Sequence, residues 1–268
     1  MKIKTYAELE NIVKHIRQTI GLNTNLGFVE HFRGQSHNKY KLLSGLGRYG
    51  FAIEKLIEGE KNIFREFKYQ IESGIFEFIQ VPFYPEKFPY KKDWFHLFQA
   101  QHIGLHTRMT DWTMNFEVAL YFCVEDENNF GIDGQFWYFC VPPEFICNSF
   151  SPNNLKSIYD THPFSNEKNL MINQPFYQNE SEIKKIAEDR RFNQSGRFFI
   201  QASSKIKTPL EEQEDLKPYL QKFIVDGKSK ESIKNELIER GITKEFIYPA
   251  ENLNIKKKIN CLNKLINK

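Results

Sequence analysis

Residues 101–113 read Gln-His-Ile-Gly-Leu-His-Thr-Arg-Met-Thr-Asp-Trp-Thr, and polar side chains with reactive or phosphate-binding potential are densest in this stretch. Gly104 interrupts it, which predicts a tight bend. After the bend the residues predict a strand, in which Thr107 and Asp111 share one face and Arg108 lies on the other. This strand carries the polar groups from which a site could be built.

The sequence on either side predicts a mixture of helices and strands. Helical apolar spacing covers 5–20, 52–72, 116–123, 230–240 and the tail from 249, and strands are expected at 26–32, 134–141, 197–200 and 221–225. They form no alternating βαβ series, so we predict a single mixed domain of the α+β class. It divides into an N-terminal helix (1–24), a core (25–205), and a C-terminal strand and helices (206–268) packed on that core.

Composition narrows the class of protein. The chain has 268 residues, of which 40% are apolar and 26% charged, and its 25 Phe predict a Phe-rich globular core. The net charge of +3 gives no strong nucleic-acid signal. No apolar run approaches the ~18 residues of a membrane span, the N-terminus lacks the apolar core of a secretory signal, and the four cysteines lack metal-ligand spacing. We expect a cytoplasmic protein with free thiols, no metal and no membrane contact.

The usual catalytic signatures are absent from the sequence, including GxSxG, HExxH, GxxxxGK[ST] and GxGxxG. Arg33 is the first candidate, because it follows an apolar strand and precedes Gly34. A glycine at a strand end lets a ligand approach the backbone, and a guanidinium there can hold phosphate or carboxylate in a fork geometry. The alternative is that Arg33 forms a structural ion pair.

Two further clusters are candidates. In the first, Arg108 and nearby threonine hydroxyls could bind an anion, and His102 could shuttle a proton. The alternative there is an Arg108–Asp111 pair that braces the corner, with His102 satisfied by the backbone. The second cluster, residues 189–197, holds three arginines and could add positive charge around a phosphate; the alternative is a solvated loop.

The chain resembles the FRG domain family, which is named for its Phe-Arg-Gly motif, at Phe32-Arg33-Gly34-Gln35 and at residues 101–113. The family's second motif runs roughly Gln-His-Tyr-Gly-Leu-Pro-Thr-Arg-Leu-Leu-Asp-Trp-Thr, followed by Asn and by Ala-Leu-Tyr-Phe. This chain supplies both at 115–122, and it matches a later Arg-x-x-Gln-x-Gly-x-Phe pattern at 191–198. His106 and Thr110 replace the usual Pro and Leu. The resemblance covers about residues 25–200.

The family is widespread in bacteria and phages, and it is similar in some respects to ADP-ribosyltransferases that use NAD. Those enzymes often carry Arg-Gly at the end of their first core strand and a Ser/Thr-rich strand that leads into a helix. The resemblance therefore implies an ADP-ribosyltransferase-like split β core with flanking helices, NAD as cofactor, and a role in bacterial defence, including phage defence, or in stress. Those enzymes usually also carry a late glutamate, where this chain has Gln194.

On this hypothesis the chain binds a nucleotide-like small molecule and transfers ADP-ribose to an acceptor, which could be a macromolecule, or hydrolyses NAD. The nucleotide would be bound by Arg33, Gly34, Thr107, Arg108, Thr113 and Arg191, and the candidates for catalysis are Asp111, Gln194 and His102. Asp111 or Gln194 could stabilise the positive charge that develops at the ribose carbon as nicotinamide leaves.

Two other hypotheses stay open. The chain could be a recognition module that binds a nucleotide, a nucleic-acid end or a phage protein without turnover. Alternatively, both motifs could be structural and hold the Phe-rich core through buried Arg–Asp pairs. Whether the protein is an enzyme is therefore left undecided by the sequence, with an NAD-using transferase or glycohydrolase favoured.

Overall fold

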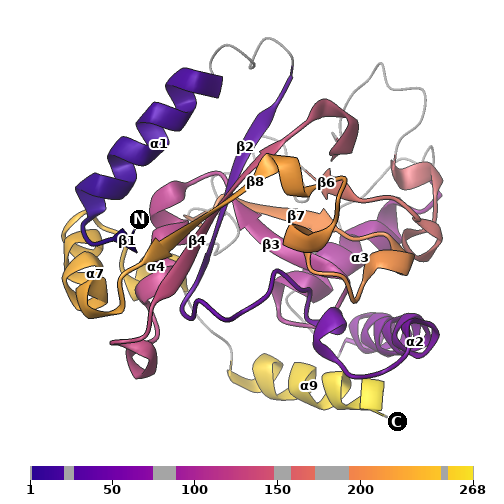
Figure 1. The fold of residues 1–268 in the computed structure, drawn as a ribbon. Helices are drawn as coiled ribbons and strands as arrows, with labels where there is room; N and C mark the ends of the chain where they lie inside the picture. The colour runs from indigo at the N-terminus through magenta and orange to yellow at the C-terminus, as the bar shows by residue number, and fades with distance from the viewer. Residues whose placement is uncertain are drawn as a thin grey trace, which may run out of the picture.

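The computed structural model describes residues 2–20, 27–74, 89–147, 158–172, 193–248 and 253–267. Within them lies a mixed sheet with the strand order β1–β8–β4–β2–β3–β7–β6–β5 (Figure 1). The pairs β1–β8 and β5–β6 are parallel and the others antiparallel. The strands are β1 (Lys2–Ile3), β2 (Val29–Gln35), β3 (Met109–Thr113), β4 (Gly134–Val141), β5 (Ile146–Cys147), β6 (Leu170–Ile172), β7 (Gly196–Ile200) and β8 (Leu220–Val225).

The α-helices are α1 (Tyr6–Ile20), α2 (Ile53–Glu72), α3 (Lys91–His102), α4 (Phe116–Val124), α7 (Lys230–Glu239), α8 (Lys244–Ile247) and α9 (Leu253–Asn263). Apart from the single turn α8, they fall into two groups. One group, α1, α4 and α7, lies beside the half of the sheet that holds β1 and β8, and the other, α2, α3 and α9, lies toward β7 (Figure 1). Helix and strand segments with one shared sheet confirm the α+β prediction.

The first helical group packs on the face of the sheet that carries Phe32 and Phe136. Helix α4 lies directly against β2, and Gly34 permits this contact. A Cβ atom built on Gly34 would lie 1.8 Å from the main-chain oxygen of Ala119 in α4. The glycine of the Phe-Arg-Gly motif is therefore required by the packing of a helix on a strand.

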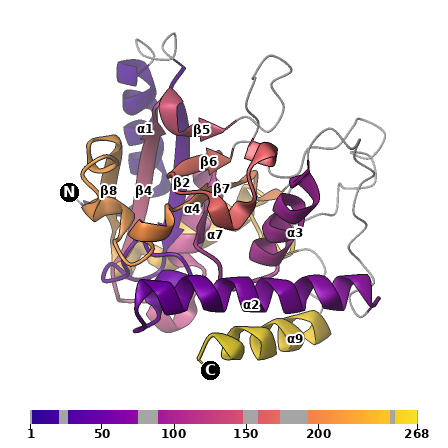
Figure 2. The ribbon, with the colours of Figure 1, turned by 90° about the vertical axis from the view of Figure 1, so that its right-hand side faces the viewer.

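The second helical group covers the other end of the same face, where Met109 and Ile200 point into the core. Helices α2 and α9 run side by side below α3 (Figure 2). The C-terminal segment contributes buried side chains to this cluster, among them Ile259, Leu262 and Ile266. The last residues of the chain thus complete the core, and β8, also from the C-terminal region, lies inside the sheet between β1 and β4.

The opposite face of the sheet carries a third cluster, in which Trp112 of β3 packs on Phe139 of β4 with ring centroids 5.2 Å apart, and Trp137 of β4 belongs to the same cluster. Irregular segments cover it and contribute Leu42 and Leu210. Successive residues of a strand point to opposite faces, and both faces of the sheet are covered. This explains why the strand at 134–141 is a continuous apolar run in the sequence.

Most expected elements are confirmed within one to three residues, including the helix at 52–72 and the strand at 134–141. Gly104 has φ +97°, which confirms the bend. The residues from Asp93 predict a short helix with Trp94 to Phe98, but helix α3 continues to His102, so the first two residues of the 101–113 stretch are helical. Helix α8 has no counterpart in the sequence prediction because it is a single turn.

The prolines in 81–92 predict a surface loop, and the Asn-, Ser- and Pro-rich residues 148–180 predict an irregular insert. Much of both segments lies outside the described residues. The described part of the second segment includes β6, which pairs with β7, so the prediction of a wholly irregular insert is wrong there.

Two findings bear on location and chemistry. Within the ranges that the structure describes, no helix is both long and apolar enough to pass through a membrane. The four cysteines are unpaired, and Cys123 is the buried one among them. Burial raises the pKa of the Cys123 thiol to about 12, so this thiol stays protonated at neutral pH.

Candidate functional site

The two strands that carry the sequence motifs, β2 and β3, are neighbours in the sheet but pair over only part of their length. β2 pairs with β4 at every residue from Val29 to Gln35, but it pairs with β3 at Phe32 and Thr113. On its other side β3 pairs with β7 over its whole length, from Met109 to Thr113. The sheet is therefore split between β2 and β3. We call this gap, bounded by residues 33–35 of β2 and 109–112 of β3, the β2–β3 fork.

Arg33 is the first residue of β2 beyond the Phe32–Thr113 pair. Its Nη1 donates a hydrogen bond to the main-chain oxygen of Asp111 on β3, so the guanidinium reaches across the fork. Its Nε is buried and has no hydrogen-bond partner. Among the described residues no carboxylate lies within ion-pair distance of Arg33, so the alternative of a structural ion pair is not what the structure shows. Burial lowers the pKa of Arg33, the charge of Asp111 raises it, and the charge of Arg48 lowers it.

The Asp111 side chain is exposed at the middle of β3. Both of its carboxylate oxygens accept a contact of 3.1 Å from Nε2 of Gln101, near the end of α3. Oε1 of the same amide accepts a hydrogen bond of 2.6 Å from the Thr107 hydroxyl, which in turn accepts from the amide of Met109 at 3.1 Å. Thr107, Gln101 and Asp111 thus form a chain of hydrogen bonds that fixes which end of the Gln101 amide faces the carboxylate.

Gln101 belongs to the polar stretch at 101–113, but reasoning from the sequence gave it no catalytic or binding role. The signal that could have assigned one is its place as the first residue of that motif. The expected turn around Gly104 hid this role, because the sequence does not show that the residues before the bend lie against the strand after it. The helix that ends at His102 brings Gln101 back over Asp111.

A second arginine lies near the fork. Residues 44–49 run alongside the Gly104 bend, where the amide of Leu46 donates to the Thr107 oxygen at 3.1 Å. The Tyr49 hydroxyl lies 2.7 Å from Nδ1 of His106. Arg48 between them is exposed, and its charge lowers the pKa of both Arg33 and His106, in each case after the larger effect of burial. His106 is therefore neutral at pH 7, and two guanidinium groups share this region.

Arg108 has a different environment. It is fully buried, and its Nε lies 3.6 Å from Oε2 of Glu60 in α2. The main-chain amide of Arg108 donates to Oε1 of Glu60 at 2.8 Å. The guanidinium also donates to the Ser203 hydroxyl and to the main-chain oxygens of Asn166 and Pro163.

This placement does not favour the expected role of Arg108 in nucleotide binding, because Nη1 and Nη2 already have partners inside the core. The Nε of Arg108 has no hydrogen-bond partner, as in Arg33, but it faces the Glu60 carboxylate in a fully buried ion pair. The placement also differs from the expected Arg108–Asp111 pair, since the acid that pairs with Arg108 is Glu60. The strand pattern alone could not show this, because Glu60 lies 48 positions earlier on a helix. Desolvation raises the pKa of Glu60 and the charge of Arg108 opposes this.

Thr113 and Gln194 lie together at the closed end of the fork. The Thr113 hydroxyl donates to the main-chain oxygen of Gln194 at 2.7 Å and accepts from the amide of Asn115 at 3.0 Å. Nε2 of Gln194 donates to the oxygen of Ile247 at 3.0 Å. These contacts tie β3 to the start of β7 and to α8.

The other candidates are placed as follows. His102 is half-buried and follows Gln101 at the end of α3. Gly34 lies at the fork beside Arg33, but its lack of a side chain is explained by α4. Arg191 lies outside the described residues. The structure thus brings together Arg33, Gly34, Thr107 and Asp111, and it separates Arg108 from them.

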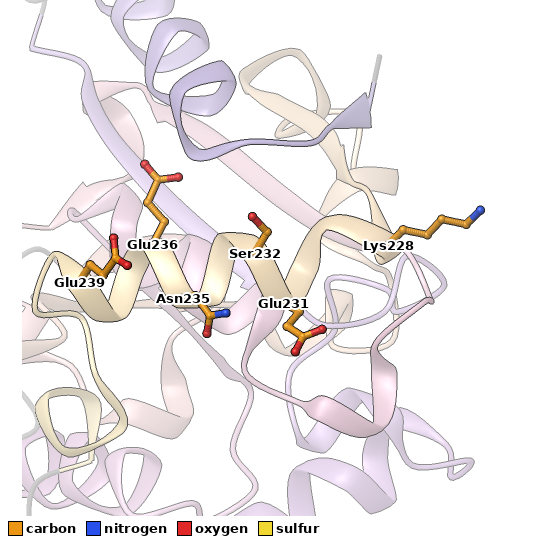
Figure 3. A pocket seen from close by; sticks show the side chains of 6 residues that line it. All are labelled: Lys228, Glu231, Ser232, Asn235, Glu236 and Glu239. Atoms are coloured by element: carbon orange, nitrogen blue, oxygen red, sulfur yellow. The ribbon is translucent and has the colours of Figure 1, made fainter.

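A shallow depression lies elsewhere, over α7 and the turn before it (Figure 3). It is lined by Lys228, Glu231, Ser232, Asn235, Glu236 and Glu239. These side chains come from one helix and its preceding turn, and they point to different sides rather than into a common cavity. It contains no residue that the sequence analysis singled out, and an acidic helix face is ordinarily a solvated surface.

Three comparisons with known proteins complete the description. The family model of the FRG domain matches residues 30–131, which confirms the resemblance over a shorter range than expected. The matched range holds β2, the Gly104 bend, β3 and α4, and it excludes the pattern at 191–198. No curated protein and no solved structure matches the chain. In the described residues, no group of three or more potential metal ligands gathers at one place.

Proposed function

The chain carries an FRG domain at residues 30–131, and from this premise we propose that it binds a nucleotide of the NAD type at the β2–β3 fork. The observation that carries the proposal is the state of Arg33. Its guanidinium lies in the fork with Nε unpartnered, and its hydrogen bond to Asp111 uses Nη1. A phosphate oxygen could satisfy the remaining donors, and charge-assisted bonds of this kind are short and strong.

The charges around the fork support an anionic ligand. The charge of Arg48 acts on Arg33, and the carboxylate next to Arg33 at the fork, Asp111, already accepts from Gln101. Two cations and one partly satisfied acid in this region favour a ligand with negative charge. A diphosphate, as in NAD or ADP-ribose, would supply one phosphate to Arg33.

Asp111 gives the proposal its chemistry. Its carboxylate is exposed and held by the Gln101 amide, so it can face the ribose that follows the diphosphate. In the proposed reaction the bond between the ribose carbon and nicotinamide breaks, and the electron pair leaves with nicotinamide. The carboxylate stabilises the positive charge that develops on the ribose. Water or an acceptor hydroxyl then bonds to that carbon and loses its proton, which gives ADP-ribose or an ADP-ribosylated acceptor.

The test combines titration with a turnover assay. Purified full-length protein is titrated with NAD and with ADP-ribose, and nicotinamide release is followed. Asp111→Asn removes the charge but keeps a side chain that Gln101 can contact, so we expect nicotinamide release to fall by about 100-fold or more. We expect NAD affinity to be unchanged or higher. Asp215→Asn makes the same substitution at an exposed acid outside the fork and should leave both quantities unchanged.

One observation favours the second candidate function, a recognition module without turnover. By the resemblance, the place of the late glutamate of transferases is held by Gln194, and its side-chain amide donates to the main-chain oxygen of Ile247. This group is used in holding α8 and carries no charge. Binding of NAD or ADP-ribose without nicotinamide release by the unmodified protein would select the recognition module, and the absence of binding would remove the nucleotide proposal.

A further inference from the structure

Asn263, the last residue of α9, holds both sides of the Gly104 bend. Its side chain is almost fully buried, with the residue 6% exposed. Oδ1 accepts a hydrogen bond of 2.8 Å from the main-chain amide of His106, and Nδ2 donates one of 3.0 Å to the main-chain oxygen of Gly104. One side chain therefore satisfies a donor and an acceptor that lie two residues apart. The Tyr49 hydroxyl also donates to the main-chain oxygen of Asn263 at 3.3 Å.

The bend is the link between the two halves of the hydrogen-bond chain at the fork. Gln101 precedes it and Thr107 follows it, and their side chains meet at 2.6 Å. Gly104 holds the left-handed backbone conformation that makes this return possible. Without the Asn263 amide, the His106 amide and the Gly104 oxygen would lack these partners, and the bend could adopt other conformations. The two hydrogen bonds therefore favour the conformation of the bend that brings Thr107 to Gln101.

We propose that Asn263 is a positioning residue for the site at the β2–β3 fork, acting through the Gly104 bend and Gln101 on the Asp111 carboxylate. The inference rests on the proposed function for its effect on ligand binding. It assigns a part in the site to a segment well outside the matched range of 30–131. The C-terminal helix thus completes the core and, in addition, sets the geometry of the motif.

Docking of α9 can be separated from this contact. Apolar side chains of α9 and of the short 3-10 helix that follows it, Lys264–Asn267, hold this segment against α2, with Ile259 and Ile266 buried. Ile266→Val trims one methylene from that interface and leaves the Asn263 amide in place, so it lowers stability without removing the contact. It is the matched control for Asn263→Ala, which removes both hydrogen bonds. Asn263→Asp keeps an acceptor for His106 and loses the donor to Gly104.

The experiment measures hydrogen exchange of the His106 amide and the Kd for ADP-ribose in the full chain. The three variants are compared with the parent at a temperature where all are folded. For Asn263→Ala we expect exchange of the His106 amide to be about tenfold faster and the Kd about tenfold higher, the scale of one or two lost hydrogen bonds. Asn263→Asp should lie between it and the parent. Ile266→Val should leave both values at the parent's level and lower the Tm.

The proposal is overturned if Asn263→Ala leaves the His106 exchange unchanged, or leaves the Kd unchanged while exchange rises. It is also overturned if Ile266→Val weakens binding as much as Asn263→Ala does. Failure of the unmodified protein to bind ADP-ribose or NAD would count against the proposed function instead. The NMR signals of the Gln101 side-chain amide then decide: a shift in Asn263→Ala but not in Ile266→Val supports positioning, and unchanged signals overturn it.

Discussion

Arg33 donates a hydrogen bond from its guanidinium to the main-chain oxygen of Asp111, across the point where β2 and β3 separate. The two residues are 78 positions apart in the sequence and belong to the two different motifs. The contact therefore joins the motifs at one place in the fold. The Asp111 carboxylate is exposed, and the Arg33 Nε is buried without a partner, so a ligand would have to enter the fork to reach the guanidinium.

The glycine of the first motif yields a prediction about stability. Gly34→Ala should destabilise the protein by about 3 kcal/mol or more, because its Cβ would lie 1.8 Å from the Ala119 oxygen and α4 would have to move away from β2. Gly50→Ala is the control, since a Cβ there meets nothing within 4 Å, and it should change stability by less than about 0.5 kcal/mol. Urea unfolding of both variants measures this. Equal stability of the two would show that α4 does not require the glycine.

Arg108 yields a second prediction, which separates a structural role from a binding role. Arg108→Met leaves the Glu60 carboxylate buried without its partner and should cost about 3–5 kcal/mol of stability. Adding Glu60→Gln removes that uncompensated charge and keeps an acceptor for the Arg108 amide, so the double variant should recover at least about half of the loss. Urea unfolding of the two variants provides the comparison. A stable Arg108→Met variant that loses nucleotide binding would instead place Arg108 in the site.

A third prediction concerns His96, whose protonation should lower the stability of the folded protein in mild acid. It is fully buried in α3, neither ring nitrogen has a hydrogen-bond partner, and burial, with a smaller effect from Lys68, lowers its pKa to about 4. Since the ordinary value is 6.5, the unfolded chain binds a proton between pH 6.5 and 4 that the folded chain does not. Stability from this group is present above pH 6.5 and is lost as the pH falls toward 4, by about 3 kcal/mol in total.

The measurement for His96 is the urea midpoint at pH 7 and at pH 5. His96→Leu should reduce the difference between the two midpoints, because the variant has no group there to protonate. The control is His15→Gln, which changes an exposed histidine on α1 and should keep the parent's difference. A pH dependence that is the same in His96→Leu and in the parent would exclude His96 as its source.

Periodicity predicted most of the elements because their apolar residues repeat at helical or strand spacing over many positions. The strand at 134–141 and the helix at 52–72 are clear cases, since each buries one or both faces. The pairing of strands was beyond the sequence. Nothing in the residues of β2 indicates that it pairs with β3 at Phe32 and then separates from it, because that depends on how β3 continues along β7.

For the site, the sequence could place Arg33, Thr107 and Asp111 in two local motifs. It could not distinguish Arg33 from Arg108, because both are arginines at the border of a strand. Their different environments come from distant residues: Glu60 in α2 satisfies Arg108, whereas the described residues provide no acid for Arg33. The role of Asn263 was hidden for the same reason, since it acts from the far end of the chain.

The most direct test of a nucleotide site at the β2–β3 fork is calorimetric titration of ADP-ribose into the unmodified protein and into Arg33→Ala. We expect Arg33→Ala to stay folded and to bind about 10- to 150-fold more weakly, which corresponds to the loss of about 1.5–3 kcal/mol from a charged hydrogen bond. The control is Arg17→Ala. Arg17 is an exposed arginine of α1 that pairs with Glu30 of β2, the strand that also carries Arg33, and this variant should bind as the parent does. Equal affinity of Arg33→Ala and the parent would contradict the placement of a nucleotide site at the fork.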